Sequence, residues 1–372
     1  MAGAGRGGKK DPVTWAIPLF FLSMAIEYRH NKKKAATNGT SGGTYERRDT
    51  AASLTMGTLS TIAPLVLPRL LRPITPGRGR YATHVIGATA VAAAAATLAD
   101  RVSATKRRRG DDPSPAAERI ASVAGTTATS AGLVSVATGW AALTSIDRLW
   151  RRRLFTLGSG PLAWAVALLG WDFIYYWNHR SMHERRFLWS VHVVHHSSEH
   201  YNLSTALRQT VSDTFGVFIP YSALCLLGVS PELVLASRGI NLIYQYWIHT
   251  EAIDRLGRAE AVLNSPAAHR VHHGVNPQYL DRNHGGILIT WDRVFGTFTE
   301  EVEPPTYGLT ENISSFSPWV IASHEYRSML SDLSMARSWS DRLGFLLKGP
   351  GWAKRRRLEL QERFVKPSAS LT

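Results

Sequence analysis

The histidines are the residues of this chain whose number and spacing could do chemistry. Eleven of the 14 histidines lie between His179 and His284. Nine of these eleven fall into four groups: His-x-x-x-His from residue 179, His-x-x-His-His from 192, Gln-x-x-x-His from 245 and a second His-x-x-His-His from 269. Because residues three and four apart share one face of a helix, each histidine pair or triplet can direct its ring nitrogens at one point.

Nine clustered imidazoles are more than one metal ion uses, since a structural site rarely takes more than about four protein ligands. The groups therefore predict two metal ions, each with room for a further ligand. No catalytic residue beyond the metal ligands is predicted. The predicted ligands are His179, His183, His192, His195, His196, His249, His269, His272 and His273.

The cysteine content excludes the other common metal sites. The chain has one cysteine, Cys225, whereas a disulfide needs two thiols and a thiolate-bound zinc or iron–sulfur site needs two to four. Imidazole suits zinc, copper, iron and nickel alike. Open coordination positions at a membrane edge favour iron and dioxygen activation. Two alternative functions without oxygen chemistry are a histidine-rich metal-binding membrane protein and a zinc-dependent hydrolase.

Several polar residues near the groups could orient the ligand imidazoles. Asp172 lies seven residues before His179 in an apolar segment, where a charge is costly and tends to be functional or paired. It either orients an imidazole, as carboxylates often do, or caps the helix end or pairs with Arg180. The other candidates for this orienting role are Glu199, Asn202, Gln245 and His284, with Glu251, Asp281 and Asp292 also close in sequence.

The elements that must position these residues are mostly apolar. The chain carries 43 Lys and Arg against 28 Asp and Glu, yet only 19% of its residues are charged, below the roughly 25% of soluble proteins. Segments of ~20 apolar residues can cross the ~30 Å hydrocarbon layer. Candidates are 51–71, 82–99 and 120–145, a stronger one at 156–177 with an aromatic end, and a retained anchor at 13–27.

The positive charge follows these apolar segments. Basic clusters lie at their ends, as at Arg69–Arg80, Lys106–Arg109 and Arg148–Arg153. Such clusters mark membrane placement, so we expect no nucleic-acid partner. Histidine groups stand at both ends of 203–248, and a shared site requires this segment to cross the membrane an even number of times. Two short helices joined near Pro231 would do so.

The sequence predicts four regions in an all-α chain. Residues 1–12 form a disordered basic tail, and 13–150 form membrane segments with basic loops. Residues 151–300 form the catalytic domain, in which the stretch 287–298 is rich in β-forming residues. Residues 301–372 form a cytosolic C-terminal tail.

Three motifs resemble those of a known family. HRSMH (179–183), HVVHH (192–196) and HRVHH (269–273), with NHGGILITWDRVFGTF (283–298), resemble the fatty acid hydroxylase and sterol desaturase superfamily of membrane non-haem di-iron enzymes. The resemblance covers roughly residues 155–300.

Two further motifs narrow the resemblance. HHSSEHYNLSTALRQ (195–209) and YQYWIHTE (244–251) look most like the alkylglycerol monooxygenase branch, which cleaves ether lipids and takes its electrons from tetrahydrobiopterin. In other branches a histidine often stands where Gln245 is. The resemblance therefore implies that one iron has a looser or water-filled coordination position.

The resemblance implies a fold, a site and a reaction. It implies a multi-pass transmembrane helical bundle with a cytosolic histidine-rich helical cap, in which the nine histidines hold two iron ions at the cytoplasmic face. It implies an enzyme that uses dioxygen to hydroxylate or desaturate an unactivated C–H bond of a lipid from the bilayer, such as an ether lipid, a fatty acid or a sterol. The electrons would come from a separate donor or from tetrahydrobiopterin.

Overall fold

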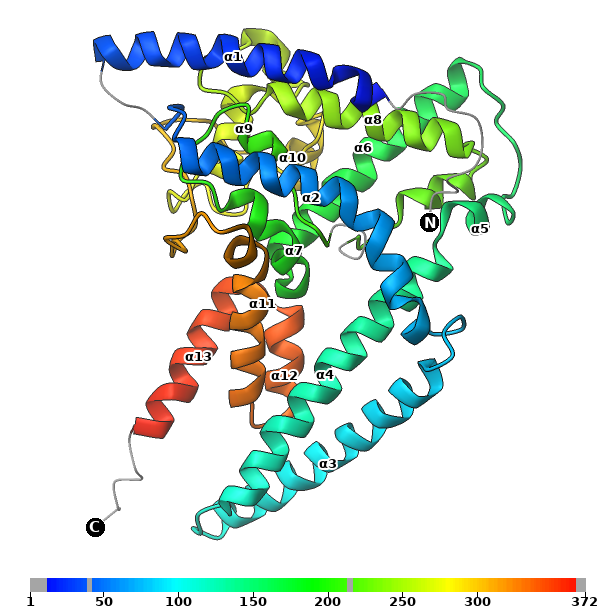
Figure 1. Ribbon diagram of the computed structural model, residues 1–372, viewed down its shortest axis with the longest axis vertical. Coiled ribbons are helices and arrows are strands. Elements are labelled where there is room, and N and C mark those ends of the chain that lie inside the picture. Colours follow the sequence, from blue (N-terminus) through cyan, green and yellow to red (C-terminus); the bar gives the residue numbers. More distant parts are fainter. Residues whose placement is uncertain (1–11, 39–41, 213–216, 366–372) are drawn as a thin grey trace. The chain divides into compact units, whose positions relative to one another are not determined.

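The computed structural model describes residues 12–38, 42–212 and 217–365, and over these residues the chain is all-helical (Figure 1). The described part contains 13 α-helices and no β-strand, and it has one isolated antiparallel bridge between Leu263 and Leu288. The predicted all-α class is confirmed. The predicted tail at 1–12 lies outside the described residues up to residue 11.

The chain divides into two compact units, and the first carries most of the histidines. This unit comprises residues 1–65, 143–181 and 191–322. Helix α1 (Pro12–Asn38) packs along α8 in this unit (Figure 1). Its α-helices are α1, the first part of α2 (Arg47–Leu71), α5 (Ile146–Trp150), most of α6 (Pro161–Glu184), the second half of α7 (Arg186–His196), α8 (Pro231–Trp247), α9 (Pro266–His273) and α10 (Thr290–Phe295).

Local sequence determines where the histidine-bearing helices start and which face they bury. The Ser265 hydroxyl accepts a hydrogen bond from the Ala268 N–H at the start of α9, and Pro266 occupies the first helical position, where its missing N–H costs nothing. Ser230 and Pro231 begin α8 in the same way. Helices α6 and α8 then share an apolar core that includes Ala163, Ala167, Trp171, Leu233 and Val234.

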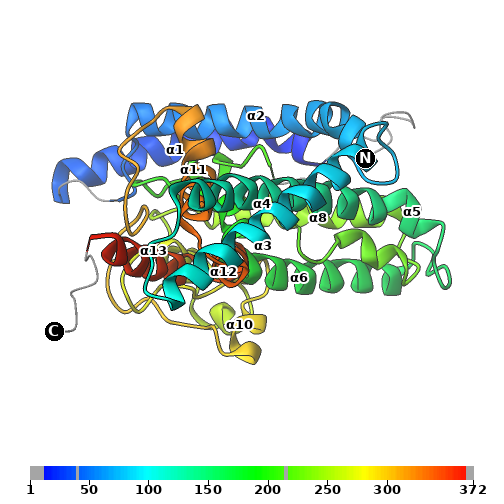
Figure 2. The same cartoon turned by 90° about the horizontal axis from the view of Figure 1, so that it is seen from below.

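The second unit is a separate helical assembly of residues 66–142, 182–190 and 323–372. Helix α3 (Ala82–Arg108) turns back into α4 (Pro115–Leu143), and the two helices lie side by side (Figure 2). Its other helices are most of α11 (Pro318–Met335), α12 (Trp339–Leu347) and α13 (Pro350–Val365). Arg342, fully buried, pairs with Asp100 at 2.5 Å and so joins α12 to α3.

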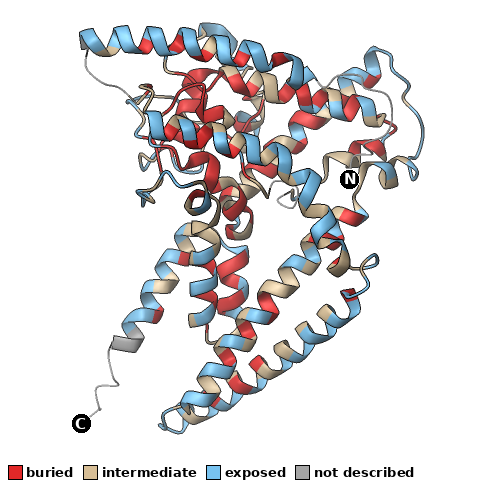
Figure 3. Cartoon of the chain, in the orientation of Figure 1, coloured by how far each residue is buried: buried red, intermediate tan, exposed pale blue. Residues whose placement is uncertain are grey.

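Three helices among the described residues are long and apolar enough to cross a membrane. They are Arg47–Ile74, Ala82–Arg108 and Pro115–Leu143, which correspond to the segments expected at 51–71, 82–99 and 120–145. Only 17 and 22% of the apolar windows of α3 and α4 are buried, and the other side chains are exposed or half-buried, as lipid-facing side chains would be (Figure 3). The chain is a membrane protein. The segments expected at 13–27, 156–177 and 203–248 are not among these three helices.

The prediction of two short helices over 203–248 is half wrong. Helix α8 begins at Pro231 as expected, but the described residues of 203–230 form only the 3₁₀ turns Thr205–Leu207 and Tyr221–Cys225. Side chains bind the backbone here: the side-chain oxygen of Asn202 accepts from the Ser204 N–H, and the Thr205 hydroxyl accepts from the Asn202 N–H. Such local bonds offer the chain an alternative to a helix.

The stretch 287–298, which is rich in β-forming residues, also does not form a strand. Residues Thr290–Phe295 form helix α10, which ends at Gly296 with φ +73°. The backbone N–H groups of Ile287 and Leu288 donate to the Asp172 carboxylate at 2.7 and 3.0 Å, so they are not available to a neighbouring strand. A buried carboxylate therefore overrides the local β propensity.

Candidate metal centre

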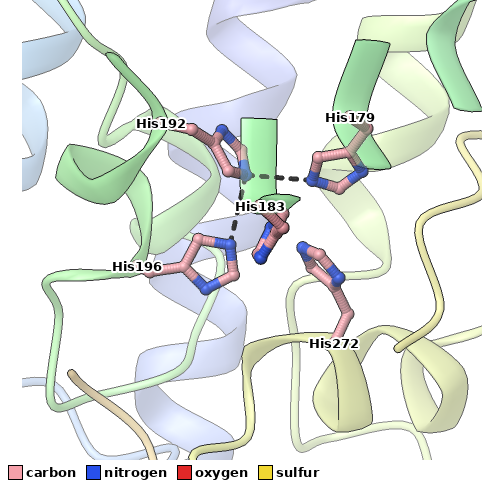
Figure 4. A group of neighbouring side chains, drawn as sticks. All are labelled: His179, His183, His192, His196 and His272. Atoms are coloured by element: carbon pink, nitrogen blue, oxygen red, sulfur yellow. Dashed lines mark hydrogen bonds between the residues drawn. The ribbon is translucent and has the colours of Figure 1, made fainter. Parts of the chain in front are cut away.

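Five histidines form the first of two groups, which we call the five-histidine group. His179 and His183 lie one turn apart on α6, His192 and His196 lie one turn apart on α7, and His272 comes from α9 (Figure 4). One ring nitrogen of each lies within 4.8 Å of those of the others, and all five are buried except His192, which is half-buried. The i, i+4 spacing on α6 and α7 turns each pair toward the same point.

Four histidines form the second group, the four-histidine group. His195 comes from α7, His249 follows α8, and His269 and His273 lie one turn apart on α9. All four are buried, and their candidate ligand atoms also lie within 4.8 Å of one another. Together the two groups contain all nine predicted ligands.

Each His-x-x-His-His motif contributes to both groups. Consecutive residues on an α-helix point about 100° apart, so adjacent histidines cannot face the same point. His195 therefore belongs to the four-histidine group and His196 to the five-histidine group. Likewise, His273 belongs to the four-histidine group and His272 to the five-histidine group. Two helices with this motif are enough to build two neighbouring sites.

Backbone carbonyl groups select the tautomer of four rings. The Nδ1 atoms of His249, His179, His272 and His195 lie 2.6, 2.9, 2.9 and 3.3 Å from the carbonyl oxygens of Gln245, His284, Arg282 and Arg208, respectively. A carbonyl oxygen can only accept, so in each pair the ring donates from Nδ1. The neutral ring then keeps a lone pair on Nε2, which is the arrangement that orients an imidazole toward a metal.

His195 and His249 consequently face each other with lone pairs. Their Nε2 atoms lie 3.1 Å apart, although both rings carry their proton on Nδ1. Burial lowers the pKa of His249 to about 4 and the pKa of His195 well below its usual value, which disfavours the imidazolium forms. A cation bound by both nitrogens would satisfy the two lone pairs.

The spacing of the ring nitrogens fits metal coordination. The Nε2 atom of His192 lies 2.9 Å from that of His179 and 3.1 Å from that of His196, and the Nε2 atoms of His249 and His269 are 3.1 Å apart. Nitrogens that bind one ion at about 2.1 Å and at right angles lie about 3.0 Å apart. His273 Nε2 is buried without a hydrogen-bond partner in the described part of the chain, as expected of a nitrogen that binds a metal ion.

Gln245 and His284 contact the rings of the two histidine groups through their backbone carbonyl groups. Their carbonyl groups receive the Nδ1 protons of His249 and His179. The Gln245 side chain is engaged elsewhere, since its oxygen accepts from the Tyr175 hydroxyl at 2.6 Å and its amide donates to Asn241. The amide of Gln245 is therefore held within a chain of polar side chains.

Asp172 contacts no histidine in the described hydrogen bonds and instead binds the loop that follows His284. Its carboxylate accepts four hydrogen bonds at 2.7–3.0 Å, from the Ile287 and Leu288 backbones, the Trp291 indole and the Asn241 amide. It thereby ties the loop after His284 to α6. Asp292 holds the other side of this loop by accepting from the His284 and Gly285 backbones, each at 2.7 Å.

The two glycines of the NHGG motif permit this close packing. A Cβ added at Gly286 would lie 2.8 Å from Asp172 Oδ1 and from Asn241 Nδ2. We expect Gly286→Ala to lower the free energy of unfolding by about 1–3 kcal/mol, the cost of overpacking, and to reduce activity because the His284 carbonyl shifts.

The effect of Gly286→Ala can be checked by thermal unfolding of the purified protein. Gly87→Ala is the matched control, because a Cβ at this position on α3 meets no atom within 4 Å. It should be neutral or stabilising, since alanine favours a helix over glycine by about 1 kcal/mol. Equal stability of the two variants would contradict the close approach at Gly286.

The remaining candidates from the sequence lie near the groups without touching their rings in the described hydrogen bonds. Glu199 is exposed. Asn202 is buried and caps the turn at Ser204 and Thr205, and Glu251 accepts from the Gly43 N–H and the Tyr307 hydroxyl. The backbone carbonyl of Asp281 lies 3.1 Å from His284 Nε2.

Sequence reasoning missed the Arg208 and Arg282 carbonyls and the Tyr201 ring. Tyr201 is fully buried and its ring centroid lies 5.1 Å from that of His273. A backbone carbonyl leaves no signal in residue type, so nothing in the sequence marks the carbonyl groups of residues 208 and 282 as acceptors for the imidazole N–H groups. Asp281 and Asn283, which flank Arg282, both have φ +57°, a conformation that Asp and Asn tolerate better than most residues.

The fold and the site define a class of protein: a helical membrane protein with two adjoining groups of buried histidines suited to metal ions. Residues 164–297 match the family model described as fatty acid hydroxylase, and this span includes all nine histidines. The match covers about a third of the chain. No solved structure matches the chain significantly.

The chain is also similar to individual curated proteins. It is 45% identical to the alkylglycerol monooxygenase of Homo sapiens over 212 residues, which are 56% of this chain and 47% of that protein. It is 48% identical to the alkylglycerol monooxygenase of Danio rerio over 189 residues, 51% of this chain and 42% of that protein.

A bacterial relative is more distant. Over 159 residues, 41% of this chain and 48% of the relative, the chain is 26% identical to the ornithine lipid hydroxylase OlsE of Rhizobium tropici. The chain thus spans about half the length of the curated relatives it matches. The predicted resemblance to the fatty acid hydroxylase family and to its alkylglycerol monooxygenase branch is confirmed.

Proposed function

We propose that this protein is a membrane-bound, non-haem di-iron monooxygenase that uses dioxygen to hydroxylate an unactivated C–H bond of a lipid, with ether lipids as the first substrate class to test. The observation that carries the proposal is the pair of buried histidine groups. They lie within a domain whose curated relatives include lipid hydroxylases and alkylglycerol monooxygenases.

The donor set fits two metal ions of the kind that imidazole binds. We assign one ion to the five-histidine group and one to the four-histidine group, and we choose iron because the family is one of iron-dependent oxygenases. Two bound iron ions would supply the redox chemistry of dioxygen that no side chain of the protein can perform.

The residues of the chain position and shield this chemistry. The carbonyl groups of Gln245, His284 and Arg282 hold the rings in the tautomer that presents Nε2. Burial of eight of the nine histidines keeps bulk water away from the reacting centre, which protects a reactive oxidant from side reactions.

The substrate would reach the site from the bilayer. Leu162 and Leu169 on α6 and Leu235 on α8 are 68, 54 and 52% exposed, so these helices present apolar surface that an alkyl chain can follow. We further propose that the histidine groups lie at the cytoplasmic face of a multi-pass protein. A separate electron donor or tetrahydrobiopterin would supply the electrons there.

The proposal is tested with the full chain in lipid nanodiscs, loaded anaerobically with iron and given an alkylglycerol and a reductant. We expect about two iron ions per chain and, under isotopically labelled dioxygen, label in the lipid product measured by mass spectrometry. Equal conversion without dioxygen, or label that comes from water, would instead indicate a hydrolase and overturn the proposal.

A further inference from the structure

Arg208 and Asp49 form a buried ion pair beside the four-histidine group. Arg208 Nη2 lies 2.5 Å from Asp49 Oδ1, and the two side chains are only 1 and 3% exposed. Arg208 closes the motif at 195–209 that the sequence singles out, whereas Asp49 lies in the first turn of α2. The pair therefore joins two parts of the first unit that are far apart in the sequence.

The pair holds the end of α7 against α2 through a set of further hydrogen bonds. The Arg208 guanidinium also donates to the Ser53 hydroxyl, the Ser197 hydroxyl and the Asp49 carbonyl group at 3.0–3.1 Å. The Ser198 hydroxyl donates to the second oxygen of Asp49 at 2.6 Å. Ser197 and Ser198 directly follow the histidine doublet at 195–196, so these bonds fix the backbone that carries it.

The backbone of Arg208 reaches the metal site itself. Its carbonyl group accepts the Nδ1 proton of His195 at 3.3 Å, the longest of the four carbonyl contacts to the histidine rings. Gln245, by contrast, presents its carbonyl group from within helix α8. Arg208 ends a single 3₁₀ turn, where its N–H donates to the Thr205 carbonyl at 3.0 Å, so its carbonyl group is anchored by this one backbone bond and by its side chain.

We propose that the Asp49–Arg208 pair is a positioning device for His195, which sets the orientation of one ligand of the four-histidine group. This inference rests on the proposed function in taking the group as a metal site. A buried ion pair contributes little net stability on average because its desolvation cost offsets its attraction. An arginine with a rigid planar fork of donors, however, fixes geometry in several directions at once, which a lysine cannot do.

The experiment compares two arginine–aspartate pairs, each with a buried arginine, in the full chain loaded with iron. Asp49→Asn and Arg208→Lys weaken the proposed device, and Asp100→Asn weakens the matched Arg342–Asp100 pair, whose nitrogen–oxygen distance is also 2.5 Å. The readouts are the thermal midpoint, the iron content and the Mössbauer spectrum, which distinguishes the two iron environments.

We expect all three variants to lower the thermal midpoint. Only Asp49→Asn and Arg208→Lys should alter the Mössbauer signal of one iron and weaken its binding by about 10- to 100-fold, the usual effect of losing a group that orients a ligand. Unchanged signals for both irons in these two variants, or the same change in Asp100→Asn, would overturn the inference.

The inference and the proposed function can fail separately. If the wild-type chain binds no iron, the proposed function fails, and zinc titration of the same variants then decides the positioning role. A zinc affinity that is unchanged by Asp49→Asn would overturn that role. A wild-type chain with two irons and dioxygen-dependent activity, but an unaltered Asp49→Asn variant, would leave the proposed function standing without the positioning device.

Discussion

Replacing His192 by alanine should abolish dioxygen-dependent lipid conversion. The Nε2 atom of His192 lies within 3.1 Å of those of both His179 and His196, so it is central to the five-histidine group. Loss of a group that merely orients a ligand costs about 10- to 100-fold in activity or metal affinity, and loss of a proposed ligand should cost more than that. Activity assays and iron analysis of the purified variant measure both effects.

The control for His192→Ala is His30→Ala, because His30 is exposed on α1 and belongs to neither group. This variant should retain the activity and the iron content of the wild type. A His192→Ala protein that folds, binds about two irons and converts lipid at the wild-type rate would contradict the assignment of this group as a metal site.

The second large effect is expected from Asp172→Ala. Its carboxylate accepts four hydrogen bonds while being 2% exposed, so its removal leaves one buried and three part-buried donors without this acceptor. Each such donor costs about 1–3 kcal/mol, so we expect the free energy of unfolding to fall by at least about 3 kcal/mol. Activity should fall with it, because the loop that places the His284 carbonyl group is released.

Thermal unfolding and activity assays check this expectation, with Asp254→Ala as the control. The Asp254 side chain is 98% exposed, and its distance of 4.0 Å from Arg270 makes their ion pair weak. Asp172→Asn should fall between wild type and Asp172→Ala, since the amide oxygen still accepts. Similar unfolding curves for Asp172→Ala and Asp254→Ala would show that the loop does not depend on this carboxylate.

Residue type and spacing predicted which histidines gather, because residues three and four apart share one face of a helix. All nine histidines predicted from the motifs fall into the two groups, and the helical spacing of His179 and His183 or of His192 and His196 predicts that each pair shares a face. The apolar segments at 82–99 and 120–145 likewise correspond to helices α3 and α4, since length and hydropathy are properties of the segment alone.

The sequence could not predict the structural features that depend on contacts between segments far apart in the chain. The apolar character of 203–230 suggested a helix, but Asn202 and Thr205 bind the local backbone instead. The β-forming residues near Ile287 suggested a strand, but a carboxylate 115 positions earlier takes their N–H groups. For the same reason Asp172 could be recognised as unusual without its partners being known, and Arg208 stood out only as part of the motif at 195–209, without a role of its own.

Helix α2 connects a candidate membrane-crossing segment to the residues that orient His195. Its first turn holds Asp49, which binds Arg208, and the same helix continues as one of the three candidate membrane-crossing segments, Arg47–Ile74. A crossing helix tilts or shifts when its apolar length and the hydrocarbon thickness differ. Any such tilt would be transmitted to the carbonyl group that orients His195, so lipid composition becomes one of the variables that adjust a histidine ring.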